Sequence, residues 1–137
     1  MKLQNKTNKN ILALAKLQVD LSKLPQLDLK VNHIFAPGIY IRELSIPKNV
    51  VVIGKTHKTE HLNTILQGRC KVTINGSIKY LTAPCTFISK KGSKKVIEAL
   101  EDTLWSTIHP TNETDLDKLE NLLIDSKMDN ELIKLGA

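Results

Sequence analysis

Short runs in which apolar and polar residues alternate fill the middle of the chain, from about residue 36 to residue 109. Alternation with a period of two is typical of strands that bury one face. Turn-forming residues separate the runs, and Asn75-Gly76 is a strong hairpin signal among them. The predicted strands cover residues 39–46, 50–53, 64–66, 69–74, 77–81, 85–89, 94–99 and 103–109. About eight short strands at this spacing predict an antiparallel sandwich or barrel.

Leucines recur at helical spacing on both sides of this strand-rich region. Before it, the pattern predicts a polar arm over residues 1–9 and then a helix that starts at an Asn10 N-cap and ends before Pro25. After it, the pattern predicts a helix capped by Thr114 and a shorter helix over Asp129–Leu135. We therefore expect an all-β domain with an N-terminal helix and C-terminal helices packed outside it.

A chain of 137 residues is long enough for a single domain with its own hydrophobic core. Its parts are residues 1–30, the arm and helix; residues 31–110, the strands; and residues 111–137, the C-terminal helices. No run of about 18 apolar residues is present, and no cleavage site follows the charged N-terminus. Two cysteines are too few for a disulfide framework. These features favour a cytoplasmic protein without a membrane segment.

The formal net charge of +6 is unevenly distributed, because carboxylates outnumber lysines only after residue 110. A basic body of this kind can bind nucleic acid. However, the sequence contains no arginine-rich helix, and no aromatic residues stand between the basic ones to stack against bases. We therefore expect a solvated basic surface and no nucleic-acid partner.

Two of the four histidines, His57 and His61, lie shortly before the turn at Gln67-Gly68. On an extended chain, positions 57 and 61 share one face, so both imidazoles can point in the same direction. His109 ends the last predicted strand and is the natural third member of an interior cluster. Such a cluster either binds a metal ion or forms hydrogen bonds in a metal-free pocket, and the pattern leaves both open. His33 belongs to no motif, and we expect it to be a surface or packing residue.

The segment that ends at Gly68 resembles the first motif of the cupin family, in which a His-x-His pair and a glutamate precede a glycine. Aligned on Gly68, His61 stands at the glutamate position, His57 at the second histidine and Lys55 at the first. The second motif, Pro-x-Gly followed by a histidine and an asparagine, aligns on Gly92 and places Lys95 at its histidine position. The resemblance covers about residues 36–109.

The layout also resembles that of small single-domain cupin proteins encoded by tailed phages. The phrases that carry this resemblance are Ala-Pro-Gly-x-Tyr-x-Arg, His-Lys-x-x-His-Leu and Glu-Asp-Thr-x-Trp-x-Thr-x-His. That subgroup implies no particular activity for this chain.

The cupin resemblance implies a cupin-like jelly-roll barrel with a site in its interior. A cupin metal site uses three histidines and a glutamate, so His57, His61 and His109 are the candidate ligands for zinc, iron, manganese or nickel. The carboxylates that could add an oxygen are Glu43, Glu60 and Glu98.

Both motif positions that have lost a histidine carry a lysine, Lys55 and Lys95, and Arg42 lies on an early predicted strand. Lysine binds an anion as a point charge and arginine as a planar fork, so both suit a phosphate or a carboxylate. The residues that we expect to bind the ligand are Tyr40, Arg42, Lys55, His57, His61 and Lys95. For the neighbouring lysines of the same turn, we expect exposure to solvent at Lys90, Lys91 and Lys94.

We therefore expect a protein that holds a small anionic ligand. The ligand carries a phosphate or a carboxylate, and a nucleotide derivative is one candidate. A metal ion at the histidine cluster accompanies it in one form of this hypothesis and is absent in the other. Two alternatives stay open: a metal-dependent enzyme of the dioxygenase, isomerase or epimerase type, and a structural scaffold protein of a phage assembly. The pattern leaves open whether the protein is an enzyme. Exposed sheet edges and leucine-striped helices favour a homodimer.

Overall fold

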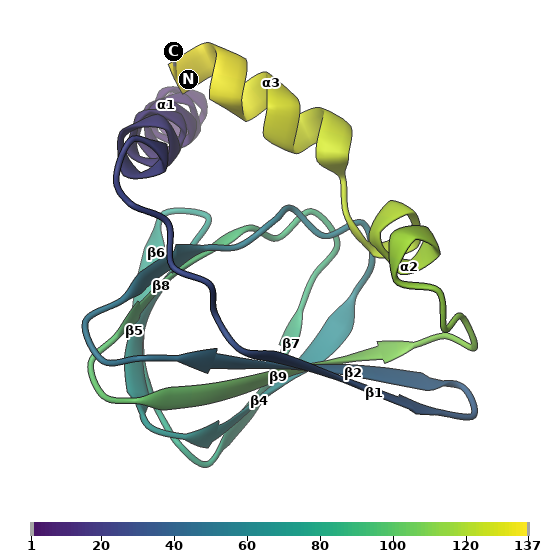
Figure 1. Ribbon diagram of the computed structural model, residues 1–137. Helices are drawn as coiled ribbons and strands as arrows, with labels where there is room; N and C mark the ends of the chain where they lie inside the picture. Colours follow the sequence, from purple (N-terminus) through teal and green to yellow (C-terminus); the bar gives the residue numbers. More distant parts are fainter. Residues whose placement is uncertain (1, 137) are drawn as a thin grey trace.

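The computed structural model describes residues 2–136, with side chains described from Asn10 onward. Within this range the chain forms nine strands and three helices (Figure 1). The helices are α1 (Lys2–Ser22), α2 (Leu116–Leu123) and α3 (Ser126–Gly136). The strands are β1 (Val31–Ala36), β2 (Ile39–Ile46), β3 (Val51–Ile53), β4 (His61–Gln67), β5 (Arg69–Ile74), β6 (Ser77–Thr82), β7 (Cys85–Ser89), β8 (Lys95–Ala99) and β9 (Thr103–Pro110). The prediction of a mostly β fold is confirmed.

The strands form two antiparallel sheets, which face each other in Figure 1. The larger sheet has the order β1-β2-β9-β4-β7, and the smaller sheet has the order β3-β8-β5-β6. Strands that are distant in the sequence therefore lie side by side, and the pairing of β2 with β9 is central to the larger sheet. This pairing places the residues around position 42 directly beside those around position 107.

The strand predictions hold best where turn residues mark both ends of a strand. The bounds of β2, β5 and β7 are those predicted from the sequence. Asn75 and Gly76 form the predicted hairpin between β5 and β6, with φ angles of 49° and 80°. Both residues lie in the left-handed region that two-residue hairpin turns require, which explains the choice of asparagine and glycine there.

The larger sheet includes one strand, β1, that the pattern does not predict. β1 pairs only with β2, and most of its residues are exposed. An edge strand of this kind buries little, so its sequence does not need the alternation that marks a central strand. Adjacent apolar residues Ile34 and Phe35 also interrupt the alternation.

Helix α1 begins at Lys2, so the predictions of a polar arm over residues 2–9 and of an N-cap at Asn10 are wrong; residue 1 lies outside the described residues. No glycine or proline interrupts this stretch before Pro25. The helix lies beside α3 (Figure 1), where the carbonyl of Ala15 occupies the space that a side chain at Gly136 would need. Tertiary contact therefore extends the helix beyond what its own sequence suggests. Within residues 2–136, no helix is both long and apolar enough to cross a bilayer.

The two C-terminal helices also begin at other residues than predicted. The N-cap of α2 is Asp115, not Thr114, and its carboxylate accepts hydrogen bonds from the amides of Asp117 and Lys118. Helix α3 begins at Ser126, three residues before the predicted start at Asp129. An aspartate is at least as good an N-cap as a threonine, so either choice was compatible with the sequence of α2.

The hydrophobic core fills one end of the space between the sheets. Its buried members are Leu44, Ile46, Ile65, Cys70, Val72, Ile97, Ala99 and Trp105. These residues occupy alternate positions along β2, β4, β5, β8 and β9, as expected for strands whose other face is more exposed. The remaining space between the sheets is lined by a different kind of side chain, described below.

A buried ion pair joins α3 to the strand-rich region. Lys94 Nζ lies 2.8 Å from Asp129 Oδ1, and their side chains are only 6% and 13% exposed. Thr56 donates to the same carboxylate through its hydroxyl, at 2.7 Å, and through its amide, at 3.2 Å. Burial acts to raise the pKa of Asp129, but the hydrogen bonds from Lys94 and Thr56 outweigh it and leave this pKa lowered. The expectation that Lys94 is solvent-exposed is therefore wrong.

We predict that Asp129→Asn lowers the free energy of unfolding at pH 7 by about 3 to 5 kcal/mol, because it leaves a buried ammonium without its carboxylate. Since the pKa of Asp129 is lowered by folding, the stabilisation is present above about pH 3.9, the value for an unfolded aspartate, and is lost as the pH falls through the folded value. Urea unfolding at pH 7 and again at a pH below about 3.9 measures this difference. The double variant Lys94→Met/Asp129→Leu is the control and should recover most of the stability.

Candidate functional site

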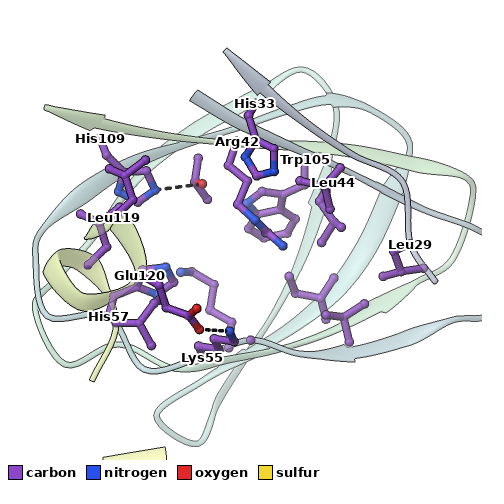
Figure 2. A pocket seen from close by; sticks show the side chains of 18 of the residues that line it. Leu29, His33, Arg42, Leu44, Lys55, His57, Trp105, His109, Leu119 and Glu120 are labelled. Atoms are coloured by element: carbon purple, nitrogen blue, oxygen red, sulfur yellow. Dashed lines mark hydrogen bonds and ion pairs between the residues drawn. The ribbon is translucent and has the colours of Figure 1, made fainter. Parts of the chain in front are cut away.

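A cavity of about 520 Å³ lies between the two sheets, beside the hydrophobic core (Figure 2). Its walls are formed by side chains of β1, β2, β3, β8 and β9 and by the loop that follows β3. Leucines of α2 and of the segment before β1 complete the lining. A volume of this size is typical of a small-molecule site.

The pairing of β2 with β9 positions most of the polar lining. Tyr40 lies opposite His109, and Arg42 lies opposite Thr107. These four side chains alternate with outward-facing residues, so the register of two central strands fixes where they enter the cavity. The predicted ligand residues Tyr40 and Arg42 both line the cavity.

His57 reaches the same region from an irregular loop. The expectation that residues 57 to 61 form one extended segment is wrong, since only His61 belongs to a strand. The His57 amide donates to the Ser93 carbonyl at 3.1 Å, and the Gly92 amide donates to the His57 carbonyl at 2.8 Å. An isolated bridge to Ile124 holds the loop from the other side. Backbone contacts from two distant segments therefore position the His57 imidazole.

The structure brings His57, His61 and His109 together as a histidine cluster. The ring centroids are 4.2 Å apart for His57 and His61, 4.8 Å for His61 and His109, and 6.0 Å for His57 and His109. Strand β4 supplies His61, and β9, its neighbour in the larger sheet, supplies His109. Three segments thus converge on the cluster. His57 and His109 line the cavity, whereas His61, although its ring lies beside both, is not among the lining residues.

Each imidazole of the cluster has one buried ring nitrogen without a hydrogen-bond partner among the described residues. These atoms are His57 Nδ1, His61 Nε2 and His109 Nδ1. His61 Nδ1 lies 3.1 Å from the Thr59 carbonyl and must donate to it, so Nε2 of the neutral ring carries a lone pair. His109 Nε2 lies 3.0 Å from Thr107 Oγ1. Buried polar atoms are rarely left unpaired, and a ligand or ordered water would satisfy them.

The surroundings of the cluster keep its imidazoles neutral. Burial, together with His61, Lys95, His109 and Arg42, lowers the pKa of His57 to about 3. Burial, together with His61, Arg42 and Lys95, lowers the pKa of His109 to about 4. The pKa of His61 is also lowered, mainly by burial. All three rings therefore act at neutral pH as hydrogen-bonding groups rather than as charges.

Two cationic side chains that line the cavity are Arg42 and Lys95. Neither has an ion-pair partner in the described part of the chain. Lys95 is only 4% exposed, and burial lowers its pKa to about 8, so its amine still carries a proton at pH 7. Lys55 differs from them. Its side chain is 61% exposed at the rim, where it forms an ion pair with Glu120 of α2 (Figure 2). Of the three expected charge partners, only Arg42 and Lys95 are therefore free.

One residue of the cavity wall was not expected there. His33 of β1 lines the cavity, and its Nδ1 lies 2.7 Å from the Tyr40 hydroxyl. Tyr40 in turn stacks between His33, Phe35 and His109, and burial raises its pKa. Recognition of β1 as a strand would have revealed this role, because His33 is paired with Arg42 and shares its face.

The cluster does not fit the metal site that the sequence resemblance implies. Within residues 10–136, no group of three or more His, Cys, Asp or Glu side chains is arranged to hold a metal ion. The planes of the three rings are inclined by only 16° to 39°, which is closer to stacking than to convergence on one point.

The expected carboxylate ligands are also displaced from the cluster. The side chains of Glu43 and Glu98 point away from the cavity, because each alternates along its strand with neighbours that line it. Glu60 is exposed and pairs with Lys90. A zinc, iron, manganese or nickel ion here would therefore meet imidazoles and two nearby cations, without a carboxylate to balance its charge.

No protein-family model matches the chain, and no curated protein matches it in sequence. Solved structures do resemble it. A cupin superfamily protein from Desulfitobacterium hafniense aligns with a TM-score of 0.54 and 14% identity, over 67% of this chain and 85% of that one. The Cnp3 cupin domain of Schizosaccharomyces pombe aligns with a TM-score of 0.53 and 20% identity, over 77% and 80%. An RmlC-like cupin from Shewanella frigidimarina aligns with a TM-score of 0.53 and 21% identity, over 62% and 78%. The two sheets therefore have a cupin-like fold.

We predict that the free energy of unfolding falls as the pH drops from about 6.5 to 4. Folding lowers the pKa values of His57 and His109, so the unfolded chain binds more protons than the folded chain in this range. Each such histidine contributes a slope of about 1.4 kcal/mol per pH unit. His57→Gln should reduce the slope by about one proton, as measured by urea unfolding at several pH values. Parallel profiles for the two proteins would contradict a neutral, buried His57.

Proposed function

We propose that the protein binds a small molecule with an anionic group, a carboxylate or a phosphate, in the cavity between its sheets. The observation that carries this proposal is that Arg42 of the larger sheet and Lys95 of the smaller sheet both line the cavity without a carboxylate partner among the described residues. A buried cation without a counter-charge is costly, and a bound anion removes that cost.

The unpaired groups suit an anion in their hydrogen-bonding chemistry as well as in their charge. Arg42 offers a planar fork of N–H donors, and Lys95 offers a point charge, so together they can bind both oxygens of one acidic group. The histidine cluster contributes neutral donors and acceptors beside them. We assign the anionic group to Arg42 and Lys95, and hydrogen bonding around it to His57, His109 and Tyr40.

Two other functions stay predictions of the sequence. A metal-dependent enzyme requires a metal ion at the histidine cluster, which the geometry of the described residues does not fit. A scaffold protein of a phage assembly requires no ligand. Elemental analysis of protein purified without a histidine tag separates these cases, because stoichiometric iron or manganese would favour the enzyme over the binding protein proposed here.

We predict that at least one anion among inorganic phosphate, glucose 6-phosphate, AMP and octanoate raises the melting temperature of the wild-type protein. Lys95→Met and Arg42→Met should each weaken that binding about tenfold or more, because each removes a charged hydrogen-bond partner. Titration calorimetry at two salt concentrations measures this loss, and binding should weaken as salt rises.

Lys91→Met is the matched control for this experiment. It removes one positive charge from the exposed turn next to β8, outside the cavity. Its affinity should stay within about twofold of the wild type, since the charge is screened by solvent. Equal affinities for Lys91→Met and Lys95→Met would remove the basis of the proposal.

We also propose that the protein is a homodimer that pairs through the outer face of its larger sheet. One row of outward-facing aliphatic side chains crosses all five strands there, and the strand registers connect its members: Ile34, Ile41, Ile108, Leu62 and Ile88. The next row is polar and contains Glu43 as its only charged member. An uncharged, continuous aliphatic row matches a second copy of itself, because sheet faces pack against each other through such rows.

We predict that Ile88→Lys shifts the protein from dimer to monomer in sedimentation at tens of micromolar, because it places a charge in the apolar contact. Thr86→Lys is the matched control, since it lies two residues earlier on the same strand and the same face, in the polar row. A wild-type protein that sediments as a monomer at this concentration would refute the dimer.

A further inference from the structure

The cavity changes from polar to apolar along its length. In the larger sheet, strand register places inward-facing polar residues side by side across β1, β2 and β9. The next set of inward-facing residues along the same strands is apolar. The polar level consists of His33, Arg42 and Thr107, and the apolar level consists of Val31, Leu44 and Trp105. The smaller sheet repeats the change on β8, where Lys95 is followed by Ile97.

Among the described residues, the apolar half of the cavity offers no free hydrogen-bonding side chain. Its walls include Leu29 from the segment before β1 and Val52 from β3, in addition to the apolar level described above. The indole nitrogen of Trp105, which lines this half of the cavity, already donates to Asn63 Oδ1 at 3.1 Å. A hydroxyl or a base placed here would lose its hydrogen bonds to water without replacement, at a cost in free energy.

We propose that the ligand is an amphipathic acid, with one anionic head group and an unbranched or aromatic hydrocarbon body. This inference rests on the proposed function, since it takes Arg42 and Lys95 as the site of the head group. It adds that the body lies among Leu44, Ile97 and Trp105. Sugar phosphates and nucleotides carry hydroxyls and bases on the body, so the apolar half of the cavity disfavours them.

The two parts of the site divide the binding energy between charge and burial. The head group gives an interaction that is nearly the same for any acid of the same charge. The body gives an increment that grows with each methylene removed from water, and a cavity of about 520 Å³ has room for a chain of several carbons. Affinity should therefore depend on chain length in a way that a purely electrostatic site would not show.

Titration calorimetry with butanoate, hexanoate and octanoate, each below its micelle-forming concentration, tests this directly. We expect the affinity to increase about fourfold per added methylene, which corresponds to about 0.8 kcal/mol. Lys95→Met should weaken all three acids by the same factor and leave the chain-length dependence unchanged. Octanol, which has the body without the charge, should bind at least tenfold more weakly than octanoate.

Leu29→Asn changes the apolar wall and should reduce the gain per methylene, whereas Leu66→Asn, an exposed position on β4 outside the cavity, should not. Equal affinities for the three acids, with binding still lost in Lys95→Met, would overturn the hydrocarbon body and leave anion binding intact. Tighter binding of glucose 6-phosphate than of octanoate would also overturn the hydrocarbon body and leave anion binding intact. If no anion binds the wild type at all, both proposals fail. The chain-length series uses the wild-type protein, so it decides the question even if a variant does not fold.

Discussion

The buried contact of Lys94 with Asp129 is the constraint on which the arrangement of the site depends. One carboxylate on α3 binds Lys94, the residue before β8, and Thr56, from the loop that carries His57. These segments are far apart in the sequence, and each would be a solvated loop or helix terminus without the others. Because the charges are withdrawn from water, they tolerate little displacement. Asp129 therefore adds to the backbone contacts of His57 a constraint on the residue before it, from a group that lies outside the cavity.

Consecutive lysines illustrate why sequence alone predicts the fold better than the site. Lys94 and Lys95 are chemically identical neighbours, yet one is neutralised by α3 and the other enters the cavity. Alternation along a strand predicts that they point in opposite directions. It does not predict that a helix from the end of the chain supplies Asp129 to one of them, because that depends on how distant elements meet.

The central strands were predictable because a half-buried strand must alternate and must end at a turn. Those conditions hold for β2, β5 and β7, and the predicted span of β2 includes Tyr40 and Arg42, which line one wall of the cavity. They do not hold for β1, an edge strand, nor for the loop of His57, whose conformation depends on contacts with Gly92 and Ile124. The length of α1 was not predicted for a similar reason, because α1 packs against α3, which is at the other end of the chain.

Trp105 is the single tryptophan of the chain, and its indole forms part of the cavity wall. Its nitrogen is held by Asn63, which in turn donates to Ser89 at 2.7 Å, so the ring has a fixed orientation. The emission of an indole depends on the polarity around the ring, and here the only such ring faces the space that a ligand would fill. The molecule thus carries its single indole fluorophore at the boundary between its core and its cavity. The occupancy of that cavity can be followed optically, in the unmodified protein, with no label attached.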